Sequence, residues 1–329
     1  MEGHRTVQRL LVVVGLLALS GPGCAWLRAR QAPPSLGAQL PASPTLEQVI
    51  QVVNRNSSQI QTFTSDEAVL SVSGAPSLRT NIAFERPRRL RIRAGTALTG
   101  SELDVGSNDS LFWVWVMRQP PLYYCRHDQF ATSPARRMLP IEPDWLVEAL
   151  GITEFDPALV HQGPMVHPGG RLEIRTTRET ADGPTTKRTI VDGTTGVVLE
   201  QSVYDAQGEL LARARASRHR RDPLSGLVMP RVVEIDCPRA QFSMRLDLGN
   251  VRINRPEGIP AELWAMPTFP GTPMVDLGDP NLQLAPSAPY AAQPAAPGAT
   301  PTTPPTVIAP ATASLGSRPP RRAWNRVRF

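Results

Sequence analysis

Histidine, cysteine and clustered carboxylates are the side chains with which this chain could do chemistry, and they are few and scattered. The five histidines are His4, His127, His161, His167 and His219. His161 and His167 lie six residues apart in a segment rich in glycine and proline, and His127 follows Cys125 by two residues. Neither spacing approaches that of a closed zinc site, so we expect no metal and no other cofactor.

The sequence also lacks the motifs that organise common catalytic sites. It contains no Gly-x-Ser-x-Gly turn for a serine nucleophile, no glycine-rich phosphate loop and no His-Glu-x-x-His zinc motif. Glu142, Asp144 and Glu148 gather around Pro143, where acidic side chains favour the start of a helix without any catalytic purpose. We therefore predict that the protein is not an enzyme and has no catalytic residues.

The net charge of +6 is confined to the two ends of the chain. Residues 1–23 carry +1, and the stretch after Asp279 carries +5, from Arg318, Arg321, Arg322, Arg326 and Arg328, which leaves the region between them neutral. A neutral fold does not attract phosphate along its length, so no nucleic-acid partner is expected. The arginine-rich end either contacts an anionic surface, such as lipid headgroups or cell-wall polymers, or is a solvated tail without a partner.

The N-terminus has the layout of a secretory signal peptide. Arg5 and Arg9 precede ten mostly apolar residues, 10–19, and small residues follow them. A membrane-spanning helix needs about 20 apolar residues, and Pro22 interrupts this stretch before that length is reached. Residues 1–23 are therefore predicted to direct export.

Residues 20–24 resemble the lipobox of bacterial lipoproteins, in which signal cleavage exposes a cysteine that carries acyl chains. The cysteine here is Cys24, although Gly21 stands where that pattern has leucine or a similar residue. Lipid attachment at Cys24 would anchor the protein to a membrane of the cell envelope, facing the periplasm. The alternative is an ordinary signal peptide followed by a chance cysteine.

Two further cysteines, Cys125 and Cys237, belong to the exported part of the chain. They form an even pair in a compartment that permits disulfides. They are either bridged to each other or two small buried side chains on different strands, and both alternatives fit the sequence.

The distribution of proline marks the domain boundaries. Most of the 35 prolines crowd into residues 31–44 and 256–320, which leaves residues 45–256 for a folded domain. The flanking parts are interpreted as a proline-rich tether over residues 24–44, a proline-rich extension over 257–279, and a disordered tail rich in Pro, Ala and Thr over 280–329.

Within the domain, one helix precedes a long series of strands. Thr45 and Gln48 form a capping-box pattern and apolar residues then recur at helical spacing, which predicts a helix over residues 45–60. After Phe63 the apolar period falls to two, with turn signals between the runs, which predicts about ten antiparallel strands. With a second, short helix at residues 143–150, the elements predict an α+β fold built on a curved antiparallel sheet or incomplete β-barrel.

Two of the predicted strands indicate what the faces of the sheet meet. Residues 89–93 alternate arginine with leucine or isoleucine, as expected where one face is wet and the other covered. Residues 112–116 are instead apolar on both faces. This strand either lines a second apolar compartment, which is a candidate ligand cleft, or is a central strand covered on both sides.

Several stretches of the domain resemble the LolA/LolB-like superfamily of periplasmic lipoprotein carriers. They match the opening helix, the aromatic strand and the late hairpins of that superfamily. They also match a turn in which a strand with an aromatic end is followed by a proline and then by a strand of basic and apolar residues. The matching stretches are residues 46–63, 84–91, 104–115, 192–196, 205–208 and 229–235, within a likeness that covers residues 45–256.

The resemblance implies an incomplete barrel whose concave face, lidded by helices, holds acyl chains. On that basis we expect an apolar cleft that binds a lipid or an acylated protein. The residues expected to line the cleft or its lid are Phe84, Leu90, Ile92, Trp113, Trp115, Trp145 and Leu146. The alternative function is a structural or scaffolding envelope lipoprotein that binds a protein or cell-wall partner.

Overall fold

The computed structural model describes residues 36–117, 119, 121–133, 136, 143–180 and 183–282 of the chain. The predicted signal peptide, Cys24, Glu142 and the arginine-rich tail lie outside these residues. Of the helices in the described part of the chain, none is both long and apolar enough to cross a membrane.

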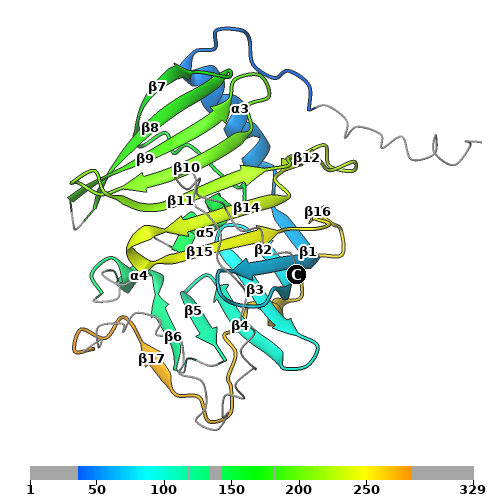
Figure 1. Ribbon diagram of the computed structural model, residues 1–329, viewed down its shortest axis with the longest axis vertical. Coiled ribbons are helices and arrows are strands. Elements are labelled where there is room, and N and C mark those ends of the chain that lie inside the picture. Colours follow the sequence, from blue (N-terminus) through cyan, green and yellow to red (C-terminus); the bar gives the residue numbers. More distant parts are fainter. Residues whose placement is uncertain are drawn as a thin grey trace, which may run out of the picture. The chain divides into compact units, whose positions relative to one another are not determined.

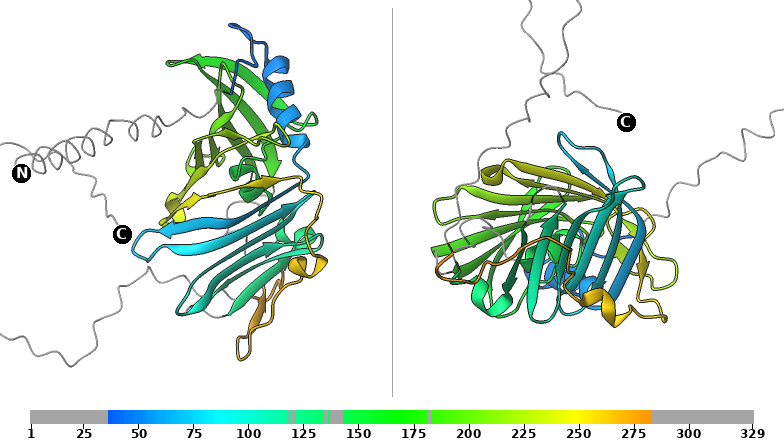
Figure 2. Two further views of the ribbon diagram at one scale, coloured as in Figure 1. Left: turned by 90° about the vertical axis from the view of Figure 1, so that its right-hand side faces the viewer. Right: turned by 90° about the horizontal axis from the view of Figure 1, so that it is seen from below.

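One large curved sheet dominates the fold (Figure 1). Its hydrogen-bonded order is β17-β6-β5-β4-β3-β2-β1-β15-β14-β11-β10-β9-β8-β7, and β16 joins it by pairing with β1. Neighbouring strands are antiparallel, except that β17 runs parallel to β6. Figure 2 shows that the sheet bends strongly without closing into a barrel.

The strands follow one another along the chain, most of them joined by short turns. Their bounds are β1 (Thr62–Val72), β2 (Leu78–Glu85), β3 (Arg89–Thr96), β4 (Gly100–Ser107), β5 (Leu111–Val116), β6 (Leu122–Arg126), β7 (Val160–His167), β8 (Arg171–Thr180), β9 (Gly183–Asp192), β10 (Val198–Tyr204), β11 (Leu210–Ser217), β14 (Val232–Cys237), β15 (Phe242–Asp247), β16 (Arg252–Ile253) and β17 (Met274–Asp276). A separate two-stranded sheet pairs β12 (Arg220–Arg221) with β13 (Val228–Met229).

The predicted α+β fold with a curved antiparallel sheet is confirmed, but the expected count of about ten strands is wrong, because the sheet has fifteen. Strand β7 is the segment rich in glycine and proline that contains His161 and His167, and it was not among the predicted strands. It is an edge strand with a register shift between Gln162 and Met165, and at such a position a proline is tolerated. Strands β16 and β17 are too short to show a two-residue period.

The two predicted helices are present. Helix α3 (Leu46–Ser58) begins with the predicted capping box, in which Thr45 N donates to Gln48 Oε1 at 2.9 Å. Its Val49 and Val53 are buried in a cluster with side chains of β8 and β9, and burying each valine contributes roughly 1.5–3 kcal/mol. Helix α5 (Pro143–Ala149) corresponds to the predicted short helix. The remaining helices were not predicted: α4 (His127–Phe130) and the 3₁₀ turns η2 (Pro238–Ala240) and η3 (Ala261–Trp264).

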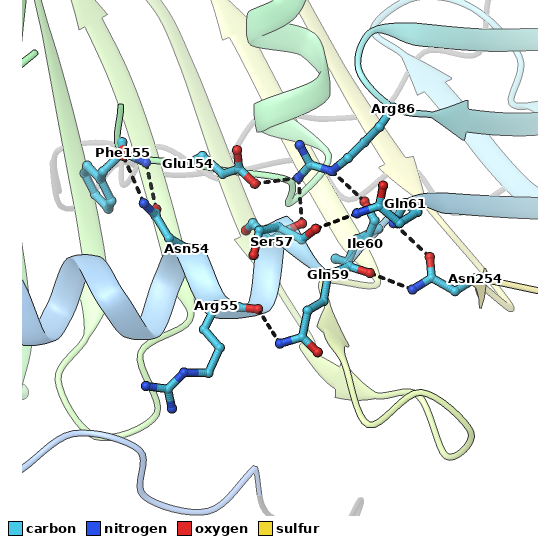
Figure 3. Close-up of polar contacts among 11 residues, drawn as sticks. Asn54, Arg55, Ser57, Gln59, Ile60, Gln61, Arg86, Glu154, Phe155 and Asn254 are labelled. Carbon is cyan, nitrogen blue, oxygen red and sulfur yellow. Dashed lines mark hydrogen bonds and ion pairs between the residues drawn. The ribbon is translucent and has the colours of Figure 1, made fainter. Parts of the chain in front are cut away.

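Arg86 joins the end of α3 to the turn between β2 and β3 (Figure 3). Its Nε donates to the carbonyl of Ile60 at 2.9 Å, and its Nη2 donates to the carbonyl of Ser57 at 2.7 Å. Ser57 lies in the last turn of α3 and its carbonyl also accepts from Ile60 N at 3.1 Å, while Ile60 lies just beyond the helix. The guanidinium group therefore ties the end of the helix to the chain that follows it. The same Nη2 pairs with Glu154 at 2.6 Å, in the segment that follows α5.

Two asparagines complete this junction (Figure 3). Asn254 accepts from the amides of Gln61 and Thr62 at 2.8 and 3.0 Å. Asn54 of α3 exchanges two hydrogen bonds with the backbone of Phe155, at 2.9 and 2.8 Å. The helix is thereby fixed both to the start of β1 and to the chain that leaves α5.

Replacing Arg86 with alanine is expected to lower the free energy of unfolding by roughly 1.5–3 kcal/mol, because it removes charge-assisted hydrogen bonds to two carbonyls. Urea denaturation followed by circular dichroism measures the change. The matched control is Arg79→Ala, since Arg79 is exposed on β2 and has no partner among the described residues. That control should stay within about 0.5 kcal/mol of the wild type, and equal losses in both variants would contradict the role of Arg86.

Candidate functional site: the concave face of the sheet

The concave face of the sheet is the candidate site, and strand register determines which side chains point to it. One buried cluster joins side chains of β1–β3 to side chains of β11, β14 and β15 across the curve, together with those of α5. Phe63, Phe84 and Leu90 are cross-strand neighbours in this cluster, as are Ile82 and Ile92. Cross-strand neighbours share a face, so the concave face can be followed outward onto β4 and β5.

The outer part of this face carries apolar side chains that are only partly covered. Val105 pairs with Val114, and Leu103 pairs with Val116, in register with the concave side chains of β3. We call six such residues the concave strip: Val72, Leu78, Leu103, Val105, Val114 and Val116. The strip has members on β1, β2, β4 and β5, whereas on β3 between them the concave side chains of Ile92 and Ala94 are buried. The six side chains of the strip are all aliphatic, so it suits an extended apolar chain.

Helix α5 lies against the concave face, where it contacts β9, β10 and β11. Trp145 is buried in the main cluster, and Leu146 packs against it while partly exposed. Glu148 holds the helix to the sheet, because Lys187 of β9 pairs with its carboxylate at 2.7 Å and Gln201 of β10 donates to its carbonyl at 3.0 Å. The start of the helix has a weaker contact, an ion pair of 3.4 Å between exposed Asp144 and Arg88.

The structure places the residues expected to line the cleft on two different faces. Phe84, Leu90 and Ile92 are buried on the concave face, where Trp145 and Leu146 of α5 meet the same cluster. Trp113 and Trp115 alternate with the concave side chains of β5 and therefore point to the outer face. The sequence alone thus did not show which face of β5 lies on the same side of the sheet as α5.

The outer face is covered where Trp113 and Trp115 lie. Trp115 stacks on Phe269 with ring centroids 3.7 Å apart, and Trp113 is fully buried. Trp113 lies opposite Gly106, and a Cβ at that glycine would fall 2.1 Å from the indole ring. The proline-rich segment after β16 therefore packs onto the sheet and closes this apolar compartment from outside.

Arg91 corrects the expectation that the arginine face of residues 89–93 is wet. It is only 6% exposed, and its guanidinium pairs with buried Asp104 at 2.6 Å. Its Nη1 donates to the carbonyls of Leu263 and Ala265 at 2.9 and 2.7 Å. A buried ion pair needs further hydrogen bonds to offset its desolvation, and the covering segment supplies two acceptors to Nη1.

Val114 and Val116 are the site residues that sequence reasoning missed. They occupy the alternate positions of the same apolar run that drew attention to Trp113 and Trp115. The signal that could have separated the two sets is Gly106, because a glycine opposite an indole indicates a crowded, covered face. The less crowded face of the strand is the one left partly open.

Cys125 and Cys237 are free thiols in this structure. Cys125 belongs to a cluster with Phe112 and Phe130, whereas Cys237 belongs to the main concave cluster. Burial raises the pKa of each thiol to about 11, so both stay protonated at neutral pH. Of the two sequence alternatives, the structure has two buried side chains on different strands.

The histidines and carboxylates have structural partners. His161 bonds Thr176 Oγ1 and the carbonyl of Asp156, each at 2.8 Å, and His167 contacts Glu173 at 2.8 Å. His127 bonds the carbonyl of Asn108 at 3.0 Å, and burial lowers its pKa. Over the described ranges, His, Cys, Asp and Glu side chains form no group of three or more that could hold a metal ion.

Neither a family model nor a curated protein sequence matches this chain. Solved structures do. A LolA superfamily protein from Nitrosomonas europaea is 10% identical with a TM-score of 0.44, over 68% of this chain and 99% of that one. A putative outer membrane lipoprotein-sorting protein domain from Vibrio parahaemolyticus is 8% identical with a TM-score of 0.45, over 66% and 96%.

A DUF1329 family protein from Desulfovibrio piger is also similar, with 16% identity and a TM-score of 0.42 over 64% of this chain and 93% of that one. A structure described as a LolA superfamily protein and one described as a lipoprotein-sorting protein domain are thus among those that are similar to this chain. At this level of identity the similarity concerns the course of the chain and not its ligand.

Proposed function

We propose that this protein is a membrane-anchored envelope lipoprotein whose domain binds the acyl chains of a lipid or of an acylated protein and catalyses nothing. The observation that carries the proposal is the concave strip, six aliphatic side chains left partly exposed on one face of a folded sheet. Apolar surface that a folded domain leaves partly exposed on one face is a candidate binding site.

The strip suits an acyl chain better than a compact or charged ligand. Its aliphatic side chains offer no donor, acceptor or charge, so affinity comes from removing apolar surface from water. Burying ten methylene groups contributes about 8 kcal/mol, at about 0.8 kcal/mol each. The acyl chain loses conformational and translational freedom when it binds, which offsets part of this gain. The free energy that remains is enough for reversible binding.

Helix α5 is the proposed lid of this site. Beyond its C-terminal end the chain is held by Arg86 and Asn54, through Glu154 and Phe155. Its N-terminal end is held by the buried side chain of Trp145 and by the exposed pair of Arg88 and Asp144, and such a pair contributes roughly 0–1 kcal/mol. An acyl chain that displaces the first turn of α5 would take the place of the Trp145 side chain in the cluster while the far end stays fixed.

The membrane anchor is proposed at Cys24. The described domain begins at Leu36, whose carbonyl accepts from Arg221 at 2.7 Å. Leu36 lies twelve positions after Cys24, a reach of at most roughly 40 Å when fully extended. A lipid at Cys24 would therefore keep the start of the domain within that distance of the membrane.

Native mass spectrometry of the purified full chain is expected to show a bound mass of lipid size, and organic extraction should identify it. The double variant Val114→Thr/Val116→Thr should lose most of that mass, because a hydroxyl buried against an acyl chain without a partner costs roughly 1–3 kcal/mol. Val69→Thr is the matched control, since Val69 is a partly exposed valine on the outer face of β1.

Two results would count against the proposed binding site. One is a wild-type chain that shows only its own mass even after incubation with total lipid. The other is an equal loss of lipid from the double variant and from Val69→Thr, because the concave strip would then have no special part in retention.

The anchor has its own test in cell fractionation. The wild-type chain is expected in the membrane fraction and Cys24→Ala in the soluble exported fraction, because the variant has no thiol to carry acyl chains. A wild-type chain that is fully soluble, or a variant that stays equally membrane-bound, would show that Cys24 is not the anchor.

A further inference from the structure

A cavity lies on the outer face of β1, β2 and β3, on the opposite side of these strands from the buried cluster. It has a volume of about 590 Å³, within the range of small-molecule sites. Thr64, Ala83 and Arg91 are cross-strand neighbours on its floor, and residues 255–260 form a wall. We call this cavity the outer groove.

The outer groove is rich in guanidinium groups. Its lining includes Arg91, Arg93, Arg252 and Arg255, against two carboxylates, Asp66 and Glu257. Positive side chains in the lining therefore outnumber negative ones by two. Asp104 and Asp222, which pair with Arg91 and Arg255 from outside the lining, balance this excess, so the attraction for an anion comes from guanidinium donors that remain free and not from net charge.

Three of these arginines are held in place by carboxylates. Arg91 pairs with Asp104 at 2.6 Å, Arg255 pairs with Asp222 at 3.5 Å, and Arg252 pairs with Asp66. These pairs fix the guanidinium groups without using every donor. The Nε atoms of Arg91 and Arg255 are buried and have no hydrogen-bond partner in the described part of the chain.

Arg93 is the arginine that is not held by any such pair. It is exposed on β3 and makes no hydrogen bond or ion pair with the described residues. Its cross-strand neighbour Asn81 also lines the outer groove and likewise has no side-chain partner there. A complete guanidinium fork and an amide are therefore available to a ligand.

We propose that the outer groove binds a phosphoryl group, with Arg93 as its principal contact and Arg252, Arg255 and Asn81 around it. Guanidinium forks match the geometry of phosphate oxygens and bind them through paired, charge-assisted hydrogen bonds. The carboxylates of Asp66 and Glu257 would repel a second anionic group, so we expect a ligand with a single phosphoryl group. The volume of the groove exceeds that of inorganic phosphate, which favours a phosphate ester or the headgroup of an anionic phospholipid.

The test compares Arg93→Gln with Arg79→Gln in the full chain carrying Cys24→Ser. Arg79 is a matched control, because it is an exposed arginine on the outer face of β2 that does not line the groove. Isothermal titration calorimetry with inorganic phosphate and with glycerol phosphate forms one arm. Flotation with phosphatidylglycerol vesicles, against phosphatidylcholine vesicles, forms the other.

Arg93→Gln is expected to weaken binding about tenfold, which corresponds to about 1.4 kcal/mol, while Arg79→Gln leaves it unchanged. This loss in the calorimetric arm identifies a free phosphate ester as the ligand, and the same loss only in flotation identifies a lipid headgroup. Absence of wild-type binding in both arms, or equal losses in the two variants, would overturn the proposal. Circular dichroism confirms that both variants fold. The concave strip lies on the other face of the sheet, so the outcome of this test is independent of whether the strip binds an acyl chain.

Discussion

Arg86 donates to the carbonyls of Ser57 and Ile60 at the end of α3 and at the same time pairs with Glu154, and the rest of the structure depends on this contact (Figure 3). Through it the helix that covers one half of the sheet, the turn that begins β3 and the chain that leaves α5 share one fixed point. Arg86 also lies within the stretch 84–91 that resembles the LolA/LolB-like superfamily.

The two faces of β1–β5 are treated differently by the rest of the chain. The outer face of β3–β5 is covered by residues 263–269, which bind Arg91 and stack on Trp115. The concave face meets α5 but keeps six aliphatic side chains partly exposed. A chain that covers one apolar face and leaves the other open has a surface available for a ligand, and this contrast supports acyl-chain binding on the concave side.

Local signals predicted much of this fold and little of the site. The capping box of Thr45 and Gln48 indicated α3, and two-residue alternation indicated most of the strands. Strand β7 was missed because its proline and its register shift break that alternation. Which face of β5 is concave depends on strand register and on a covering segment about 150 residues further along the chain. A local sequence pattern contains neither, so Trp113 and Trp115 were expected on the concave face, where Val114 and Val116 lie.

The central claim is that an acyl chain lies along the concave strip and displaces α5. Hydrogen–deuterium exchange of the full chain, with and without a bound fatty acid, tests it most directly. The account predicts slower exchange in β4 and β5, faster exchange in α5, and unchanged exchange in α3, which its junction with the sheet keeps in place. Unchanged exchange in α5, β4 and β5 while the fatty acid is bound, or a change confined to residues 263–269, would contradict it.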